Sequence, residues 1–299
     1  MHCIRLVLEN SLQGLWFFNL SKYTRSPMTL QEISEKLFVD LKQIKLNAPL
    51  VHNITNYVVM NSTANALLAI GASPVMAHAK PEVEEFVAMS SSVVLNIGTL
   101  SKPWIESMEL AAETAQKLKK PFVLDPVGNG ATKLRTETVE SILQYSPTVI
   151  RGNGSEILAI NHSSANTKGV DSLHSSQSAL DSAKLISSKF SSVVVVSGET
   201  DYIIHKERMA SVQNGHPIMT KVTGMGCSAS ALVGAFLGVE PDPFLASLFA
   251  MIVMGVCGEV AEKSSKGPGS FFPAFLDTLY HCSEWDWKEK IKATVLSSP

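Results

Sequence analysis

The chain has 299 residues, of which 45% are hydrophobic and 17% are charged, with 25 Lys and Arg against 27 Asp and Glu. This composition is that of a globular protein with a large core, and it excludes a disordered chain. The net charge of −2, without a basic run that carries interleaved aromatic residues, argues against nucleic acid as a partner.

The first 27 residues differ from the rest of the chain. Their apolar stretch and their positive charges do not follow the order of a secretory signal peptide. We expect residues 1–27 to be a poorly structured extension or a start-site artefact, and residues 28–299 to form one domain.

Helical and strand-like patterns alternate from residue 28 onward. Leu30, Ile33, Leu37, Leu41 and Ile44 are three and four residues apart, which predicts an amphipathic helix over 29–46. Further helices are expected at 58–70, 82–89, 101–119 and 137–144, and strands at 74–77, 92–98, 122–124, 148–150 and 193–196. The polar stretch 161–178 is interpreted as a variable excursion. Later come a hairpin of 202–205 with 209–212 and apolar helices at 227–237, 243–262 and 272–282. This alternation predicts an α/β fold with a mostly parallel central sheet and helices on both faces.

The longest apolar stretch runs from Phe244 to Cys257, between Asp242 and Glu259. It is shorter than the ~18 residues that suggest a membrane span, so we expect a buried helix and no membrane partner. The cysteines form no CxxC pair and have no nearby histidine pattern, which predicts neither a disulfide framework nor a zinc site and favours a reducing cytoplasm. They are Cys3, Cys227, Cys257 and Cys282.

A glycine-rich turn at 221–228 leads directly into a helix of small and apolar residues. The glycines allow backbone N–H groups to face an anion, and the start of the helix directs its positive dipole end to the same place. The pattern predicts an anion hole, and with it a phosphoryl-transfer site, formed by Gly224, Met225, Gly226 and Cys227. Close packing of a helix on a strand is the alternative reading of the glycines.

Three other apolar runs end in polar clusters, at 124–132, 151–156 and 193–199. They bring Asp125, Arg151, Glu156 and Ser197 to the ends of predicted strands. Such strand ends gather along one edge of an open α/β sheet, which is where these folds bind ligands.

Seven segments of the chain resemble the hydroxyethylthiazole kinase family of the ribokinase-like superfamily, in the family's order. They lie at 49–56, 71–77, 95–100, 124–128, 151–153, 221–227 and 266–271. The resemblance implies a ribokinase-like fold and Mg²⁺- and ATP-dependent phosphorylation of the alcohol of 4-methyl-5-(2-hydroxyethyl)thiazole, a salvage step in thiamine diphosphate biosynthesis. It also implies a homotrimer with the thiazole bound between subunits.

The resemblance assigns Cys227 as the catalytic residue, at the position where other ribokinase-like enzymes carry an aspartate base. A thiol pKa is lowered at a helix start, so we expect a thiolate that accepts the alcohol proton. With a loose transition state, positioning of the hydroxyl can matter more than removal of its proton. Asp125 and Glu156 are expected to hold Mg²⁺, with helix or loop capping as the alternative for each.

The resemblance also supplies the binding residues. Arg151, Asn153 and Ser197 are expected to contact ATP, with Ser197 at a position that we associate with threonine in the family. The resemblance implies that the thiazole is contacted by Met76, Gly224, Asn53 and Val59. Met225 replaces an alanine between the two glycines, and its side chain is expected to crowd the turn.

Two alternatives stay open. A related kinase would act on another vitamin alcohol or a sugar, and the cysteine at 227 argues against it. A non-catalytic thiazole or nucleotide sensor would be expected to have a damaged phosphate site, whereas Gly224, Gly226, Cys227, Asp125 and Arg151 are all present.

Overall fold

The computed structural model describes residues 28–164 and 175–297. The expectation for residues 1–27 lies outside the described residues, as does that for the middle of the stretch 161–178. At the two ends of that stretch the chain is helical.

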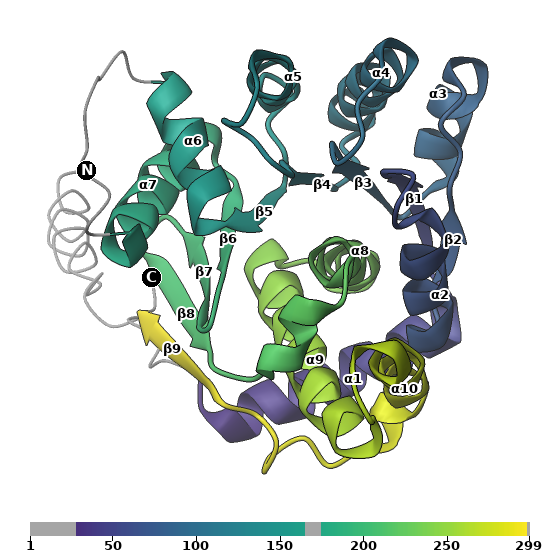
Figure 1. Cartoon of the computed structure of the whole chain (residues 1–299), viewed down its shortest axis with the longest axis vertical. Helices are drawn as coiled ribbons and strands as arrows, with labels where there is room; N and C mark the ends of the chain where they lie inside the picture. Colours follow the sequence, from purple (N-terminus) through teal and green to yellow (C-terminus); the bar gives the residue numbers. More distant parts are fainter. Residues whose placement is uncertain (1–27, 165–174, 298–299) are drawn as a thin grey trace, which may run out of the picture.

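A single sheet forms the centre of the molecule in the described part of the chain (Figure 1). Its order is β2-β1-β3-β4-β5-β6-β7-β8-β9, with parallel pairing from β2 to β6 and antiparallel pairing from β6 to β9. The strands are β1 Leu50–Ile54, β2 Ser73–Val75, β3 Ser92–Asn96, β4 Phe122–Asp125, β5 Val149–Asn153, β6 Val193–Ser197, β7 Asp201–His205, β8 Arg208–Val212 and β9 Ala293–Ser297. The expected mostly parallel α/β sheet is confirmed.

Helices cover both faces of this sheet, as predicted. The helices are α1 Leu30–Asn47, α2 Met60–Ile70, α3 Lys80–Met89, α4 Lys102–Leu118, α5 Lys133–Leu143, α6 Gly154–Ser164, α7 Ser175–Phe190, α8 Met225–Leu237, α9 Pro243–Ser264 and α10 Pro268–His281. Helices α3 to α7 lie over one face, and α8 to α10 with α1 and α2 lie over the other (Figure 1).

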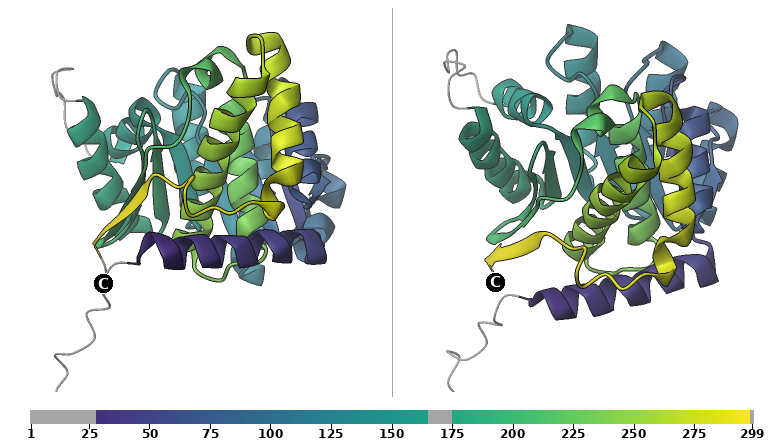
Figure 2. Two further views of the ribbon diagram at one scale, coloured as in Figure 1. Left: turned by 90° about the horizontal axis from the view of Figure 1, so that it is seen from below. Right: turned by 60° about the horizontal axis from the view of Figure 1, so that its bottom comes forward.

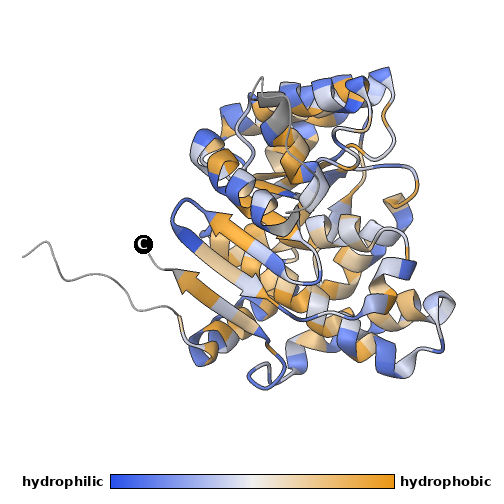
Figure 3. Ribbon diagram, turned by 60° about the vertical axis from the view of Figure 1, so that its left-hand side comes forward, coloured by the Kyte–Doolittle hydropathy of each residue, from blue (hydrophilic) through white to orange (hydrophobic). Residues whose placement is uncertain are grey.

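Within the described residues this arrangement forms two hydrophobic cores, because successive strand residues point to opposite faces. In β3, Val93 and Leu95 belong to the core beneath α3–α7, whereas Val94 belongs to the core beneath α8 and α9. Apolar residues (orange in Figure 3) gather on the strands and inner helix faces, and polar residues (blue) on the outer surfaces.

Helix α9 contains the long apolar stretch of the sequence. It is long and apolar enough to cross a membrane, but 89% of its apolar window is buried inside the molecule. Together with α8 it forms the centre of one core. The prediction of a buried helix is confirmed.

Several element boundaries differ from the expectations. Strand β1 was not expected, because His52 and Asn53 interrupt its apolar pattern although both are buried. Helix α5 begins at Lys133, after a cap by the Thr132 hydroxyl, and α10 begins at Pro268. Strand β9 near the C-terminus was also not expected; it joins the sheet through antiparallel pairing with β8.

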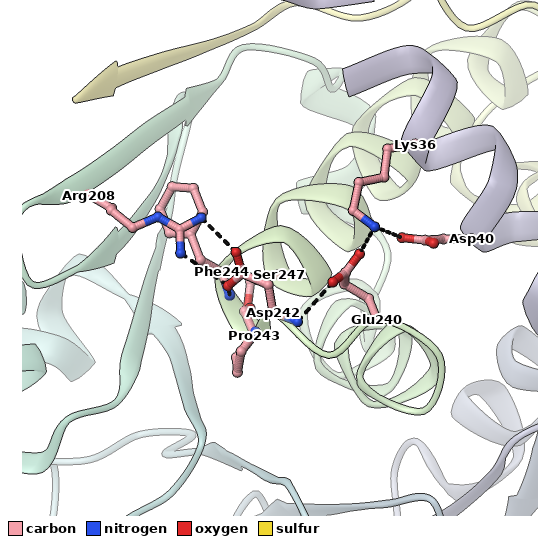
Figure 4. Close-up of polar contacts among 8 residues, drawn as sticks. All are labelled: Lys36, Asp40, Arg208, Glu240, Asp242, Pro243, Phe244 and Ser247. Atoms are coloured by element: carbon pink, nitrogen blue, oxygen red, sulfur yellow. Dashed lines mark hydrogen bonds and ion pairs between the residues drawn. The ribbon is translucent and has the colours of Figure 1, made fainter. Parts of the chain in front are cut away.

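Helix α1 lies across the ends of α8, α9 and α10, away from most other helices (Figure 2). Lys36, Asp40 and Glu240 form a polar cluster, here called the α1 cluster, that holds the helix to the loop between α8 and α9 (Figure 4). The Lys36 ammonium forms ion pairs with the carboxylates of Glu240 and Asp40, and these carboxylates are 3% and 5% exposed. In the same loop Asp242 accepts two hydrogen bonds from the Arg208 guanidinium, at 3.1 and 2.7 Å.

This cluster makes the free energy of unfolding depend on pH. Burial and a hydrogen bond with Glu240 raise the pKa of Asp40 to about 7, although Lys36 opposes the shift. Because the folded pKa is above the unfolded one, the contribution of Asp40 is full at low pH and is lost as the pH rises through about 7.

We therefore expect Asp40→Asn to gain stability relative to the parent between about pH 5 and pH 8, by about 2 kcal/mol. Chemical denaturation at both pH values measures this, with Asp277→Asn on the exposed surface of α10 as the control. Equal effects of Asp40→Asn at the two pH values would show that Asp40 does not titrate in this range.

Candidate active site

The carboxyl ends of the parallel strands bring the polar residues together. Asn96 ends β3 and is paired in register with Asp125 at the end of β4. Asn153 ends β5 and is paired with Ser197 at the end of β6. Helix α8 begins at Met225 and lies over β3 and β4, so its N-terminal turn meets this edge.

Gly224 of the predicted anion hole is required by its backbone conformation and its close neighbour, whereas Gly226 leaves room for a flexible side chain. Gly224 is the N-cap of α8 with φ +87°, and an added Cβ would lie 2.8 Å from a methyl carbon of Val59. A Cβ on Gly226 would lie 2.8 Å from Nη1 of Arg151. Between them, Met225 is 5% exposed and belongs to the core, so its side chain is accommodated in the core. The guanidinium of Arg151 thus lies directly against the glycine turn.

The resemblance implies that ATP binds at this turn. On that basis we expect Gly226→Ala to lower kcat/KM for ATP on the order of 10- to 100-fold, because the added methyl group displaces the Arg151 guanidinium from the turn. The melting temperature should change little, since the clash is with the far end of a flexible side chain. Steady-state kinetics with varied ATP measure the effect. An unchanged kcat/KM would show that this position of Arg151 is not needed.

Cys227 lies in the first turn of α8 and is half-buried. Its Sγ accepts hydrogen bonds from Asn96 Nδ2 at 3.2 Å and from Asn56 Nδ2 at 3.6 Å. Burial and then the charge of Asp125 raise the pKa of this thiol to about 11, although both amides and Arg151 oppose the shift. The expectation of a lowered thiol pKa was wrong, because burial and the charge of Asp125 outweigh the effects that lower it. The free protein therefore keeps Cys227 as a thiol at neutral pH.

Asp125 is 1% exposed beside this thiol. Its Oδ2 accepts hydrogen bonds from Asn96 Nδ2 at 2.6 Å and from Ser230 Oγ at 2.8 Å, whereas its Oδ1 has no protein partner. Burial raises the pKa of Asp125 to about 6, and the charge of Arg151 is the main opposing effect. A buried carboxylate oxygen without a partner fits a cation ligand.

Glu156 serves as a cap in this structure. Its carboxylate accepts hydrogen bonds from the backbone N–H groups of Gly128 at 2.9 Å and Asn153 at 2.8 Å, and Asn153 Oδ1 accepts one from the N–H of Glu156 at 3.0 Å. This reciprocal pair is a capping box at the start of α6. Over 28–164 and 175–297, no three His, Cys, Asp or Glu side chains are grouped closely enough to hold a metal by themselves.

A cavity of about 680 Å³ opens beside Arg151. The guanidinium donates from Nη2 to Ser197 Oγ at 2.8 Å, and its buried Nε has no partner. Asn153, by contrast, is exposed and uses its side-chain oxygen to cap α6. The cavity is lined by Arg151, Ser197, Gly198, Glu199, Asp201, Asn214, Gly215, His216, Pro217, Met219, Thr220, Met225, Gly226, Ala229, Met251, Met254 and Gly255.

The residues expected on the thiazole side lie outside this cavity. Val59 is buried against Gly224, and Met76 is half-buried just after β2. Asn53 was expected in a loop, but it lies within β1, is 1% exposed, and has no hydrogen-bond partner for either amide atom.

Sequence reasoning missed the amides that connect the site, Asn96 and Asn56, together with Ser230. It also missed Arg135, whose guanidinium donates to the carbonyl oxygens of Ile97, Gly98 and Val127 and so joins the loops after β3 and β4. Of these four residues, Asn96 could have been found from the sequence, because it is a polar residue at the end of an apolar run.

The fold places the chain in a class of proteins. It aligns with a ribokinase-like superfamily protein from Enterococcus faecalis V583 at a TM-score of 0.60 and 14% identity, covering 86% of this chain and 95% of that one. The chain therefore has a ribokinase-like fold. It belongs to the hydroxyethylthiazole kinase family, whose model matches residues 41–284, and it is accordingly a kinase with ATP as co-substrate.

Individual relatives agree with this family. A hydroxyethylthiazole kinase from Leptospira biflexa serovar Patoc is 54% identical over 264 residues, which are 88% of this chain and 99% of that protein. One from Syntrophus aciditrophicus is 51% identical over 265 residues, 88% and 98% of the two chains. The solved structure of a hydroxyethylthiazole kinase protein from Pyrococcus horikoshii OT3 matches at a TM-score of 0.82 and 41% identity, covering 88% of this chain and all of that one.

Proposed function

We propose that the protein transfers the γ-phosphoryl group of ATP to the alcohol of 4-methyl-5-(2-hydroxyethyl)thiazole, a salvage step in thiamine diphosphate biosynthesis. The observation that carries the proposal is the meeting of Arg151, the glycine turn, Cys227 and Asp125 at one sheet edge. Phosphoryl transfer needs positioned reactants and neutralised phosphate charge, and this edge offers groups for both.

The nucleotide is proposed to occupy the cavity beside Arg151. The Nε and Nη1 groups of Arg151 and the N–H groups of 224–227 would bind the phosphates, since charge-assisted and helix N-terminal donors suit them. Ser197 would orient the guanidinium through their 2.8 Å hydrogen bond, and Asn153 would contact the nucleotide at the exposed end of β5.

Mg²⁺ is proposed to be held by Asp125 through its unpartnered Oδ1. Glu156 would act through water, because backbone N–H groups already occupy both of its carboxylate oxygens. When bound, the ion would neutralise phosphate charge.

Cys227 is proposed to position the acceptor hydroxyl. Its sulfur is fixed by two amide donors, and its raised pKa favours hydrogen bonding to the alcohol over early removal of the proton. In a loose transition state the alcohol proton leaves late, so a strong base is not required.

The thiazole is proposed to lie near Gly224, Val59, Asn53 and Met76, next to exposed Tyr57. We further propose a homotrimer in the cytoplasm, with the thiazole sites between subunits. Exposed apolar side chains near the site support a contact between subunits there, since Tyr57 and Val58 are each 63% exposed in the single chain.

Turnover with purified protein tests the proposed function. ADP release with ATP and Mg²⁺ should depend on hydroxyethylthiazole and should be far slower with hydroxymethylpyrimidine or ribose. Faster turnover with another alcohol would show that this alcohol, and not hydroxyethylthiazole, is the substrate. Nucleotide binding without any turnover would favour the alternative of a non-catalytic sensor.

We propose that residues 28–299 form a single kinase domain and that residues 1–27 are an extension or a start-site artefact. An added segment is in keeping with the Leptospira relative, because 264 residues match 99% of its length and leave 35 of the 299 residues of this chain outside the match. Deletion of residues 1–27 is expected to leave the melting temperature and kcat unchanged, which calorimetry and ADP release measure. A large drop in the melting temperature or in kcat would show that residues 1–27 are part of the fold.

A further inference from the structure

The side chain of Asn96 lies between the two chemically active groups of the site. Asn96 is the last residue of β3 and is 1% exposed. Its Nδ2 is 2.6 Å from Asp125 Oδ2 and 3.2 Å from Cys227 Sγ. Asp125 belongs to β4 and Cys227 to α8, so one amide joins a strand end to a helix start.

The orientation of this amide is fixed by its other end. Asn96 Oδ1 accepts hydrogen bonds from the backbone N–H of Gly98 at 3.0 Å and from Asn56 Nδ2 at 2.8 Å. A backbone N–H can only donate, so the oxygen must face Gly98 and the Nδ2 group must face the carboxylate and the sulfur. Each hydrogen of Nδ2 therefore has its own acceptor.

Asn56 supports the arrangement from the side. Its Nδ2 donates to Asn96 Oδ1 and lies 3.6 Å from Cys227 Sγ. Gly98 leaves room for this amide, because an added Cβ would come within 2.4 Å of Asn56 Nδ2. The sulfur thus has amide donors from two residues that also bond each other.

We propose that Asn96 is a positioning residue for phosphoryl transfer, which holds the sulfur of Cys227 at a fixed place relative to the carboxylate of Asp125. This inference rests on the proposed function of the site. It adds a residue whose action passes through Cys227, where a displacement of about 1 Å can cost on the order of a hundredfold in rate.

Kinetics of Asn96→Ala test the proposal, with Asn96→Ser as a second variant whose hydroxyl is too short to bridge both groups. We expect kcat to fall on the order of 50-fold, with KM for ATP and thiazole changed less than about threefold. Ser92→Ala is the matched control, because Ser92 lies on the same strand and donates to the Gly234 carbonyl of α8 at 2.6 Å. It should keep kcat within about threefold of the parent.

A double-mutant cycle separates positioning from a structural role. In a Cys227→Ala background, Asn96→Ala should cost only a few-fold in kcat, because the group that it positions is gone. A loss on the order of 50-fold that persists in that background would overturn the proposal.

Crystal structures supply a readout that does not depend on turnover. In Asn96→Ala the Cys227 side chain should occupy a second rotamer, whereas Ser92→Ala should keep the parent rotamer. A sulfur that stays in place in Asn96→Ala would overturn the positioning role even if the parent is inactive. Absence of thiazole-dependent turnover in the parent would instead refute the proposed function.

Discussion

Asp125→Asn is expected to lower kcat on the order of a thousandfold while the protein becomes more stable at neutral pH. The asparagine oxygen can still accept the hydrogen bonds from Asn96 and Ser230 that Oδ2 accepts now. The charge disappears, and with it the anionic oxygen proposed as the cation ligand. The loss of rate would therefore not arise from misfolding.

The stability gain follows from the raised pKa of Asp125, about 6. An acid whose folded pKa is raised contributes stability at low pH that is lost as the pH rises through the folded pKa. Removing the ionisation should raise the melting temperature at about pH 8 and change it less at about pH 5. Thermal scans and ADP release measure the two effects.

Asp40→Asn is the matched control for this variant, because Asp40 is also a buried acid with a raised pKa. It lies in the α1 cluster, outside the site, so it should gain stability at high pH and keep full activity. Near-parent activity in Asp125→Asn would remove the charge of Asp125 from the mechanism.

Cys227→Ala is expected to lower kcat on the order of a hundredfold, with the KM for thiazole changed only a few-fold. Alanine removes the group that meets the acceptor hydroxyl and leaves the N–H groups of the turn in place. Cys227→Asp should retain much of the activity, because a carboxylate can accept hydrogen bonds from Asn96 and Asn56 as the sulfur does.

Steady-state rates of the two variants decide this prediction. An alanine variant as fast as the parent would exclude Cys227 from the reaction. An aspartate variant as slow as the alanine variant would show that the geometry of the sulfur, and not its hydrogen-bonding capacity, is what the site requires.

Much of the fold could be predicted because its signals are local. Helix α1 was predicted from the spacing of Leu30, Ile33 and Leu37. Strands β4 and β6 were predicted from the apolar runs before Asp125 and Ser197. Strand β1 could not be recognised, because His52 and Asn53 are buried polar residues inside it. Strand β9 could not be recognised either, since it depends on pairing with the distant β8.

The site was predictable to the extent that strand ends reveal it. Asp125, Arg151 and Cys227 come together as expected, but the direction of the Cys227 pKa shift depends on burial and on a carboxylate about a hundred positions away in the chain. For Glu156, an acid at a helix start, sequence alone could not choose between a cap and a metal ligand. The structure shows the cap.

The mass of the product is the most direct test of the central claim. The full-length protein would be incubated with ATP, Mg²⁺ and hydroxyethylthiazole, and the products would be identified by mass spectrometry. We predict one new phosphate ester on the hydroxyethyl oxygen, formed in equal amount to ADP. ADP with free phosphate and unchanged thiazole would contradict the claim, because the site would then transfer the phosphoryl group to water.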